Sequence, residues 1–491
     1  MTDTLLNLSN PEKLFIGGDW AASSDADGIE IVSPSTEEVV GRVGKAGRAD
    51  MDRVVAVARH AFDHGPWPRM IGAERAAVLR RIAGEMGKRA DDFARAWSLQ
   101  VGMPYAQSSM TAPYMAAYLT YFADLAEKGF EEVRQPMMGG HCIVVHEPVG
   151  VVAAVVPWNA PLATLLLKVA PALAAGCAVI AKPSPETPLE ALILAECIAA
   201  AGVPEGVFSV LTADREVSDH LIRNPGIDKV SFTGSTAAGL HIASVCGGRM
   251  ARVTTELGGK SAAIVLDDAT IETVVAGIMP NLVGLCGQQC AAFSRILVSA
   301  ARKAEVIEAM AAAMQAVTVG DPFDQATQMG PLVTRNQHGR VFGYIEKGKA
   351  EGARLVTGGG RPAHLPKGWF VEPTLFADAS NDMAIAREEI FGPVGTIIAY
   401  DDEEQAIAIA NDSNYGLSGG VFTESPDRAY AVARRIRTGN FGHNGRVIDF
   451  TMPYGGFKQS GIGREGGIEG LRAFTEIKAV FMPELPTHLR S

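Results

Sequence analysis

A cysteine in a small polar turn is the residue of this chain best placed for covalent chemistry. Cys290 closes the stretch Gly287-Gln288-Gln289-Cys290, which follows an apolar segment at 278–286 and precedes a strand-like run at 296–298. The glycine lets the backbone turn tightly, so that its amide groups can face a substrate. A thiolate at this position is a candidate nucleophile, and the alternative is a small buried core cysteine.

Two further polar side chains have the types that a base and an oxyanion donor require. Glu256 lies between a threonine-rich strand and Gly258-Gly259, at an expected domain junction where clefts form. Its carboxylate is a candidate general base, or else a structural ion-pair partner. Asn159 follows the apolar run 149–156, and its amide either donates to a developing oxyanion or bonds the turn backbone.

Three segments have features of a dinucleotide site. The turn 232–239 carries Gly234 and Ser235 where a strand passes into a helix, and free amides at a helix N-terminus attract phosphate. This turn lacks the GxGxxG pattern, and an ordinary N-capped turn looks similar. Lys182 lies at the end of another expected strand, where ligands bind to parallel sheets. Its side chain either bonds a ribose or a phosphate, or is a solvated surface lysine. Phe391, after two glutamates, packs either on a ring or in the core.

Composition excludes several other classes of protein. The 491 residues are 20% charged, with a net charge of −11 and no basic block, which argues against a nucleic-acid partner. The six cysteines are dispersed without a CxxC pair, and His60 and His64 have no evident third ligand, so we expect no metal site. The N-terminus has no signal-peptide pattern, and no apolar run is long enough to span a bilayer. We therefore expect a cytoplasmic protein with no membrane partner.

Strands and helices alternate along most of the chain and would position these residues. Alternation at this spacing predicts parallel sheets, and hence an α/β fold of two doubly wound domains that divide near Leu257. Near the N-terminus we expect a hairpin between 14–18 and 29–32, and a helix capped by Asp50. Pro113 should separate helices, with the next one running over 114–130. Further strands are expected at 142–148, 149–156, 177–182, 208–211, 229–232, 262–266, 296–298, 396–399 and 420–422, and further helices at 162–175, 271–283 and 303–317.

Taken together and in this order, the motifs closely resemble those of the NAD(P)-dependent aldehyde dehydrogenase superfamily. The resemblance covers nearly the whole chain, and its most specific parts are Pro157-Trp158-Asn159, Phe232-Thr233-Gly234-Ser235-Thr236, Glu256-Leu257-Gly258-Gly259-Lys260, Gly287-Gln288-Gln289-Cys290, Glu389-Ile390-Phe391-Gly392-Pro393-Val394 and Pro453-Tyr454-Gly455-Gly456-Phe457-Lys458-Gln459-Ser460-Gly461. It implies a Rossmann-like cofactor domain (1–125 and 148–257) and a catalytic domain (258–460). It also implies a small β oligomerisation arm (126–147 and 473–491) and a homo-oligomer, either a dimer or a tetramer.

The resemblance also assigns catalytic roles. Cys290 looks like the nucleophile that forms a thiohemiacetal with the aldehyde, which becomes a thioester after hydride transfer to the nicotinamide. Asn159, with the backbone amide of Cys290, looks like the oxyanion hole. Glu256 looks like the base that activates water for thioester hydrolysis. Lys168 and Glu476 match positions proposed to relay the proton outward.

On the cofactor side, one departure from the family pattern leaves the choice of cofactor open. Many NAD-preferring members carry a glutamate three residues after the lysine, where this chain has Pro185, with Glu186 one step later. NAD is expected, and NADP remains possible, because proline would not repel a 2′-phosphate. The residues that match cofactor-binding positions are Trp158, Lys182, Gly234, Ser235, Leu257, Glu389 and Phe391.

On the substrate side, the resemblance places a tunnel around Cys290. Two positions that are aromatic in several relatives are Ala160 and Leu167 here, and smaller side chains widen a pocket. The hypothesis is oxidation of a bulky, mainly apolar aldehyde to the carboxylate. The alternative is a semialdehyde dehydrogenase, with Arg446 binding the substrate carboxylate. An acylating enzyme and a crystallin-like protein are disfavoured because Glu256 and Cys290 are both present. The expected tunnel residues are Ala160, Thr164, Leu167, Gln289, Ala291, Arg446, the loop 445–452 and Tyr454.

Overall fold

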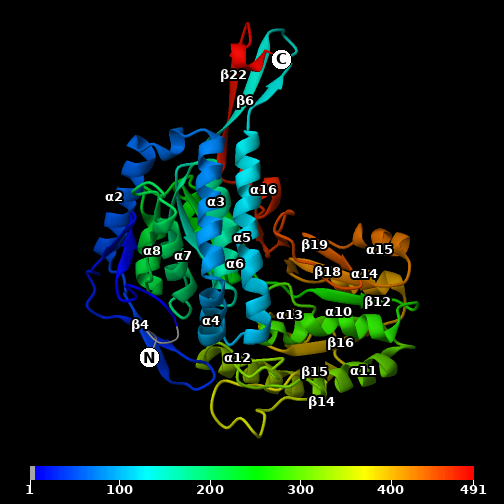
Figure 1. Cartoon of the computed structure of the whole chain (residues 1–491). Helices are drawn as coiled ribbons and strands as arrows, with labels where there is room; N and C mark the ends of the chain where they lie inside the picture. Colours follow the sequence, from blue (N-terminus) through cyan, green and yellow to red (C-terminus); the bar gives the residue numbers. More distant parts are fainter. Residues whose placement is uncertain (1–5, 491) are drawn as a thin grey trace.

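Two largely parallel sheets and a projecting β arm make up this computed structural model, which describes residues 6–490 (Figure 1). The first sheet has the strand order β2-β1-β9-β8-β7-β10-β11-β21. It comprises β1 (Leu14–Ile16), β2 (Asp19–Ala21), β7 (Val151–Val155), β8 (Ala178–Lys182), β9 (Phe208–Val210), β10 (Lys229–Thr233), β11 (Arg252–Glu256) and β21 (Gly461–Ile462).

The second sheet has the order β14-β15-β16-β13-β12-β18-β19. The chain enters it through the segment 257–261, which joins β11 to β12. Its strands are β12 (Ala262–Val265), β13 (Arg295–Ser299), β14 (Arg354–Thr357), β15 (Thr374–Ala377), β16 (Val394–Tyr400), β18 (Ser418–Phe422) and β19 (Asn440–His443). Two short pairs stand apart from both sheets: β3 (Ile29–Val32) with β4 (Val39–Val43), and β17 (Tyr415–Gly416) with β20 (Phe457–Lys458).

Helices cover both faces of the first sheet. Successive residues of β7 and β8 are buried in different hydrophobic clusters, as the period of a strand requires. On one face the helices are α3 (Gly72–Lys88), α4 (Ala90–Val101), α5 (Tyr105–Lys128), α6 (Pro161–Ala175) and α7 (Leu189–Ala200). On the other they are α2 (Arg48–His64), α8 (Arg215–Arg223) and α9 (Thr236–Gly247).

The second sheet is covered on both faces in the same way. On one face pack α10 (Ile271–Val283) and α11 (Lys303–Gln315), and on the other pack α12 (Arg335–Ala350), α13 (Ala384–Arg387), α14 (Glu403–Asn411) and α15 (Pro426–Ala433). The short helix α16 (Gly467–Arg472) packs on α6, and single 3₁₀ turns occur at Trp67–Arg69, Gly284–Gly287 and Thr487–Leu489. The predicted fold class, two doubly wound α/β units with a small β arm, is confirmed.

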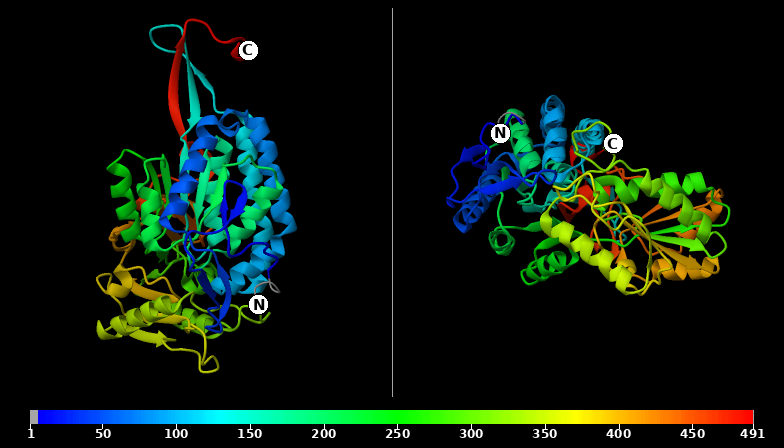
Figure 2. Two further views of the ribbon diagram at one scale, coloured as in Figure 1. Left: turned by 90° about the vertical axis from the view of Figure 1, so that its left-hand side faces the viewer. Right: turned by 90° about the horizontal axis from the view of Figure 1, so that it is seen from below.

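The arm projects from the body of the molecule (Figures 1 and 2). It contains β5 (Glu132–Arg134), β6 (His141–Pro148) and the C-terminal strand β22 (Thr475–Met482). β22 pairs antiparallel with β6 from Thr475 opposite Pro148 to Met482 opposite His141. The arm therefore joins two segments that are more than 300 residues apart in the chain.

Three local predictions were wrong. The strand 14–16 pairs with β2, and 29–32 pairs with β4, so the two do not form a hairpin with each other. Asp50 lies inside α2, where its carboxylate accepts a 2.9 Å hydrogen bond from the N–H of Gly47, the true N-cap. Pro113 lies inside α5, whose packing over many turns tolerates the one missing hydrogen bond.

Two findings concern the compartment predictions. No helix within residues 6–490 has the length and apolarity needed to cross a membrane. The first four residues, on which the absence of a signal-peptide pattern was judged, lie outside the described residues.

Candidate active site

The carboxyl ends of four neighbouring strands carry many of the predicted site residues. β8, β7, β10 and β11 lie side by side and parallel, so their carboxyl ends meet at one edge of the first sheet. Lys182 ends β8, Trp158-Asn159 follows β7, Gly234-Ser235 follows β10 and Glu256 ends β11. Sheet topology thus brings these side chains to one edge.

The loop before Cys290 is held in an unusual backbone conformation. After α10 the chain turns left-handed at Leu285 (φ 50°), Cys286 (φ 53°) and Gly287 (φ 68°). Such angles are uncommon for residues other than glycine and are found preferentially at functional sites. A Cβ atom on Gly287 would lie 2.2 Å from the carbonyl carbon of Gly392, so no larger residue fits there.

Asn159 joins this loop to the first sheet. The side-chain Nδ2 atom of Asn159 donates a 2.8 Å hydrogen bond to the backbone carbonyl of Gln288. The backbone carbonyl of Asn159 accepts a 3.0 Å hydrogen bond from Trp97 Nε1. The side chain of Gln288 is completely buried and accepts from the N–H of Val333. A primary amide has two hydrogens, so Asn159 retains one donor for a substrate oxygen. Sequence reasoning missed Gln288 and Trp97.

The sulfur of Cys290 lies in a polar corner of the site. Its Sγ atom is 3.6 Å from the Tyr454 hydroxyl. Burial raises the pKa of the thiol, while the Tyr454 hydrogen bond and the charge of Arg446 oppose this increase. Cys286 is also a free thiol, fully enclosed, and burial alone raises its pKa.

Glu256 is buried without a hydrogen-bond partner for either carboxylate oxygen in the described structure. Burial raises the pKa of this carboxyl well above its ordinary value, and the charge of Glu465 raises it further. Lys168 and Arg464 oppose that shift. Gly455 approaches closely, since a Cβ there would lie 2.6 Å from Glu256 Oε1. An unpaired carboxyl with a raised pKa suits a general base or acid.

The structure gives Lys168 and Glu476, the two residues of the expected proton relay, different partners. Lys168 is completely buried on α6, and its Nζ atom bonds the carboxylate of Glu465 and, at 2.6 Å, the Thr233 hydroxyl. Glu476 lies on β22, where it forms a partly exposed ion pair with Arg252. The sequence could have indicated Glu465, because it closely follows the glycine-rich tail motif that ends at 461.

A cavity of 620 Å³ adjoins the predicted adenosine end of the cofactor site. Its lining includes Lys182, Pro185 and Glu186, and residues of α8 and α9 close it. Burial lowers the pKa of Lys182 to about 8, opposed by the charges of Glu186 and Asp214. The Glu186 carboxylate accepts a hydrogen bond from Ser184 and lies beside the position where Pro185 departs from the family pattern.

The turn between β10 and α9 forms one wall of this region. Ser235 is the N-cap of α9, and its hydroxyl accepts from the N–H of Ala238 at 3.3 Å. Gly234 donates its N–H to the carbonyl of Glu256 at 3.1 Å. Leu257 is buried against α9, since a Cβ on Gly239 would lie 2.4 Å from its Cδ2 atom.

Residues from the second sheet complete the opposite side. Glu389 accepts a 3.1 Å hydrogen bond from the N–H of Gly259, and burial raises its pKa to about 7. Phe391 (φ 62°) meets Trp158 edge to face, with ring centroids 5.2 Å apart. Gln337 donates to the carbonyl of Phe391 at 2.7 Å and so supports this strained residue.

The predicted substrate residues around α6 and Cys290 differ in their burial and in their contacts. Thr164 donates its hydroxyl to the carbonyl of Ala160 at 2.9 Å, Leu167 is buried, and Ala291 has no exposed surface. Ala160 adjoins a small cavity shared with Trp97 and other side chains.

Arg446 is held by two neutral amide oxygens. Its guanidinium donates to Asn281 Oδ1 at 2.6 Å and to Gln289 Oε1 at 2.7 Å. Asp449, three residues further along the same loop, accepts a hydrogen bond from the hydroxyl of Thr451. Within residues 6–490, Arg446 has no carboxylate partner.

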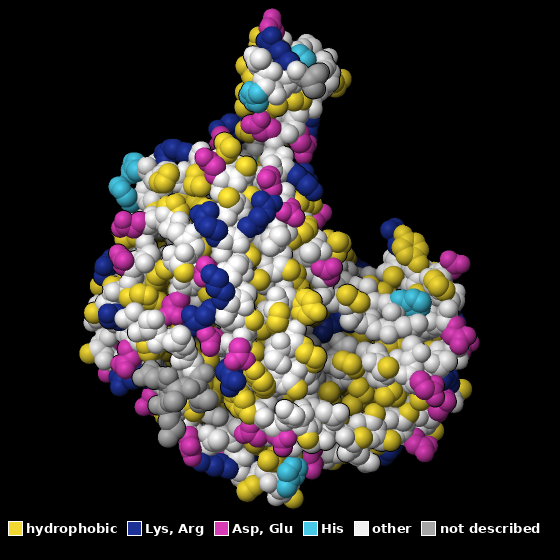
Figure 3. Space-filling model, in the orientation of Figure 1, with side chains coloured by type: hydrophobic (Ala, Val, Ile, Leu, Met, Phe, Trp, Pro, Cys, Tyr) yellow, Lys and Arg dark blue, Asp and Glu magenta, His cyan; other side chains and the backbone are white. Residues whose placement is uncertain are grey.

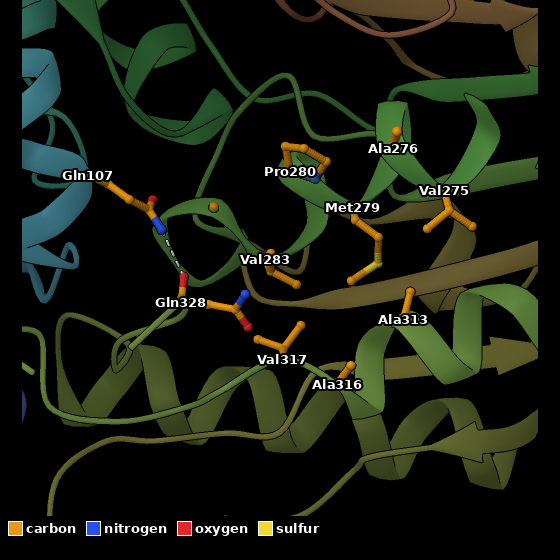
Figure 4. Close-up of a pocket in the computed structure, with 11 residues that line it drawn as sticks. Gln107, Val275, Ala276, Met279, Pro280, Val283, Ala313, Ala316, Val317 and Gln328 are labelled. Carbon is orange, nitrogen blue, oxygen red and sulfur yellow. Dashed lines mark hydrogen bonds between the residues drawn. The ribbon is translucent and has the colours of Figure 1, made fainter. Parts of the chain in front are cut away.

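A largely apolar cavity of 540 Å³ lies between α10 and the end of α11 (Figure 4). Side chains of α10 and of the end of α11 form it, with two glutamines at one end: Val275, Met279, Val283, Ala313, Val317, Gln107 and Gln328. Pro280 and Gly284 belong to its wall, and their carbonyls accept hydrogen bonds from Gln289 Nε2 at 3.3 and 2.9 Å. Gln289, the residue before Cys290, therefore bonds the wall of this cavity. The sequence did not indicate that α10 forms a wall of this apolar cavity.

Comparison with known proteins finds a matching family and relatives that are named for their activity. The model of the aldehyde dehydrogenase family matches residues 20–480. Geranial dehydrogenase of Castellaniella defragrans is 46% identical over 473 residues, which are 96% of this chain and 98% of that protein. The 3-succinoylsemialdehyde-pyridine dehydrogenase of a Pseudomonas species is 42% identical, covering 95% of this chain and 98% of that protein.

A solved structure shows the same fold over almost the whole length. The crystal structure of a Mycobacterium tuberculosis aldehyde dehydrogenase complexed with NAD+ has a TM-score of 0.94 to this chain at 46% identity. The match covers 97% of this chain and 99% of that one.

Proposed function

The chain belongs to the aldehyde dehydrogenase family, and we propose that it oxidises bulky, mainly apolar aldehydes to carboxylates with NAD+. The single observation that carries the choice of substrate is the 540 Å³ apolar cavity at α10, whose wall residues Pro280 and Gly284 accept hydrogen bonds from Gln289, the residue before Cys290. Geranial, the substrate named for one relative, is an aldehyde of this kind.

Cys290 forms the covalent bond to the substrate. Its thiolate adds to the aldehyde carbon, and the oxygen that becomes negative is stabilised by the free amide hydrogen of Asn159 and by the backbone N–H of Cys290. Loss of hydride from the resulting thiohemiacetal leaves a thioester on Cys290. NAD+, when bound, supplies the hydride acceptor.

Glu256 completes the reaction by taking a proton from the water that attacks the thioester. Because neither oxygen of its carboxylate is engaged, the group is free to accept that proton. The buried Lys168–Glu465 pair lies close enough for both charges to affect the pKa of Glu256. This pair is therefore the proposed route by which the proton leaves the site.

The cofactor region fits a dinucleotide. The 620 Å³ cavity carries Lys182 at its base, and the N-terminus of α9 presents free amides to a pyrophosphate. Glu389, held by Gly259, is placed for a ribose, and the Trp158–Phe391 pair flanks the expected nicotinamide end. These residues bind and orient the cofactor.

The entrance to the site supports the same choice of substrate. Exposed apolar side chains of α5, Met110 and Tyr114, lie on the helix that contacts the loop 446–452, where Tyr121 donates to the carbonyl of Thr451. Val447 and Met452 of that loop are also exposed. Figure 3 shows hydrophobic side chains gathered in the hollow beside α5. An apolar rim lowers the free energy of an apolar ligand at the entrance.

The substrate proposal is tested by filling the cavity. Ala313→Phe places a ring between α10 and α11, and should lower kcat/KM for geranial or a medium-chain aldehyde about tenfold or more. Activity on propanal should change little, because a short aldehyde does not reach the cavity. Both activities are measured on a panel of aldehydes from the absorbance of the reduced cofactor.

The matched control is Ala312→Phe, which adds the same ring one residue away at an exposed position that is not part of the cavity wall. Its profile should match that of the unmodified enzyme. Activity confined to acetaldehyde and propanal, or an equal loss on short and bulky aldehydes in Ala313→Phe, would refute the substrate proposal.

The preference for NAD+ over NADP+ is proposed to come from Glu186. Its carboxylate is part of the cavity wall, and a negative charge there repels a 2′-phosphate. Glu186→Gln should raise kcat/KM with NADP+ about tenfold, while the value with NAD+ stays within a few fold. Glu216→Gln, which removes an exposed charge at the same cavity, is the control and should change the NADP+ value less. An unchanged NAD+/NADP+ ratio in Glu186→Gln would exclude Glu186 as the determinant.

A semialdehyde is the second candidate, and Arg446 is the observation that favours it. A guanidinium near Cys290 that bonds only amide oxygens can bind a substrate carboxylate. The relative named for 3-succinoylsemialdehyde-pyridine provides a precedent. If this alternative is correct, succinic semialdehyde is the best substrate in the panel, and Arg446→Met raises its KM much more than it raises the KM of neutral aldehydes.

A further inference from the structure

The sulfur of Cys290 has one hydrogen-bond partner within residues 6–490, the hydroxyl of Tyr454 at 3.6 Å. A sulfur is large, so this distance is within the range of a hydrogen bond to it. Asn159 is directed to the carbonyl of Gln288. Thus neither the proposed oxyanion donor nor the proposed base contacts the thiol in this structure.

The Tyr454 side chain is fixed from several sides. Its backbone N–H and carbonyl both pair with Glu465, at 2.6 and 2.8 Å, in an isolated antiparallel bridge. The ring of Phe450 meets its ring edge to face with centroids 6.1 Å apart. Its neighbour Gly455 touches the carboxylate of Glu256. One short segment thus places Tyr454 against the nucleophile, Gly455 against the base and Glu465 against Lys168.

We propose that the Tyr454 hydroxyl is a catalytic residue that donates a hydrogen bond to the Cys290 thiolate and so maintains the nucleophile in its reactive, ionised form. The inference rests on the proposed role of Cys290 and adds a residue to it. A hydroxyl is a stronger donor to a thiolate than to a neutral sulfur, because the acceptor is charged. The bond is therefore strongest before the aldehyde is attacked and weakens when the thioester forms.

The charges around the sulfur make such a donor necessary. Burial and the charges of Glu389 and Glu256 raise the pKa of the Cys290 thiol, whereas the Tyr454 hydrogen bond and the charge of Arg446 lower it. The pKa of Tyr454 is itself raised well above its ordinary value by burial and by the neighbouring thiol. Its hydroxyl consequently keeps its proton over the working pH range and acts as a donor.

The experiment compares Tyr454→Phe with the unmodified enzyme, without substrate or cofactor. The rate of alkylation of Cys290 by iodoacetamide is measured from pH 6 to pH 10, with Cys290→Ala as the blank for the five other cysteines. Loss of the hydroxyl should shift the profile to higher pH and slow alkylation about three- to tenfold below the thiol pKa. The two rates should converge at high pH, because both thiols are then ionised.

The pre-steady-state burst of reduced cofactor should follow the same pattern, with recovery at high pH. A residue with only a structural role would lower the rate at every pH. The matched control is Tyr121→Phe, which removes the hydroxyl that bonds Thr451 in the loop before Tyr454 but does not touch the sulfur. Its alkylation profile should match that of the unmodified enzyme.

Superimposable alkylation profiles for Tyr454→Phe and the unmodified enzyme would overturn the assignment. That outcome is separate from failure of the proposed function, which would appear as residual aldehyde oxidation by Cys290→Ala. A parallel shift in Tyr121→Phe would also overturn it, because loosening of the loop would then explain the effect.

Discussion

Glu256 combines burial with a carboxylate that has no hydrogen-bond partner in the described structure. Its pKa is raised in the folded protein, so the fraction of carboxylate increases with pH above the ordinary range of a carboxyl. In the proposed mechanism, hydrolysis of the thioester requires that carboxylate. The residue thus links the pH dependence of turnover to that of stability.

Glu256→Gln should lower kcat about 100-fold or more and make the thioester accumulate, because the water loses its base. A burst of reduced cofactor followed by very slow turnover measures this. A steady-state rate close to that of the unmodified enzyme would rule out Glu256 as the base.

The same substitution has a predicted effect on stability. A raised pKa means that the folded state holds the proton more tightly than the unfolded state, so stability is lost as pH rises above 4.5 through the folded pKa. The amide of the Glu256→Gln variant does not ionise and would avoid that loss. The difference in Tm between the variant and the unmodified enzyme should therefore grow with pH. A difference that stays constant from pH 5 to pH 9 would contradict the pKa direction.

Lys168 and Glu465 show how a buried ion pair can be retained near a reacting centre. Both side chains are almost fully buried, and Ser231 and Thr233 complete their hydrogen bonds at 3.0 and 2.6 Å. Satisfied hydrogen bonds offset the desolvation of two charges. These partners lie on β10, next to the strand that carries Glu256.

At the scale of elements, the end of α10 determines where Cys290 lies. The left-handed turn at 285–287 brings Gly287 against Gly392-Pro393 of the loop that also carries Phe391. The nucleophile loop and one wall of the cofactor site are therefore packed backbone to backbone. A change that displaces the Cys290 loop is therefore expected to displace the Phe391 loop as well, and the reverse.

Gly287→Ala should lower the free energy of unfolding by about 2 kcal/mol or more, since φ is +68° and the new Cβ would contact backbone atoms that cannot rotate away. Turnover should fall with it, because Cys290 shifts. Urea unfolding followed by fluorescence measures the change.

Gly84→Ala in α3 is the matched control, since no atom lies within 4 Å of its added Cβ. Alanine in a helix interior should be stabilising by about 0.5–1 kcal/mol there. Equal effects at the two positions would show that the close approach at Gly287 is unimportant.

At the scale of the whole molecule, the arm lacks a cover on its apolar side. Ile477 and Phe481 of β22 are both exposed, and Met137 and Met138 lie in the turn before β6. Exposed apolar groups on a projecting strand pair favour association with another copy. The proposed homo-oligomer would bury this side of the arm.

Phe481→Asp should therefore shift the oligomer to smaller species, because burying a carboxylate at an apolar contact is unfavourable. Light scattering after size-exclusion chromatography measures the mass. Lys478→Gln, at an exposed position on the opposite face of the same strand, should leave the mass unchanged. An unchanged mass in Phe481→Asp would place the contact elsewhere.

The sequence by itself determined the local elements and the candidates for the reactive groups. Buried strands such as 151–155 follow from continuous apolar runs, because burial on both faces requires them. The helix 271–283 follows from its apolar content, although only one side of it is buried. Cys290, Glu256 and Asn159 were selected by residue type and by motif. Gly176 was correctly predicted to end α6, since φ is +101° there.

Only the tertiary structure decided which groups meet. Lys168 pairs with Glu465 rather than Glu476, Tyr454 reaches the sulfur of Cys290, and α10 provides an apolar wall, because each contact joins elements far apart in the chain. The strand 14–16 pairs with β2 and also with β9, and hydrophobic patterning alone does not specify these partners. Local patterns fix period and burial, whereas partners are set by the order of strands in the sheets and by the packing of loops across the cleft.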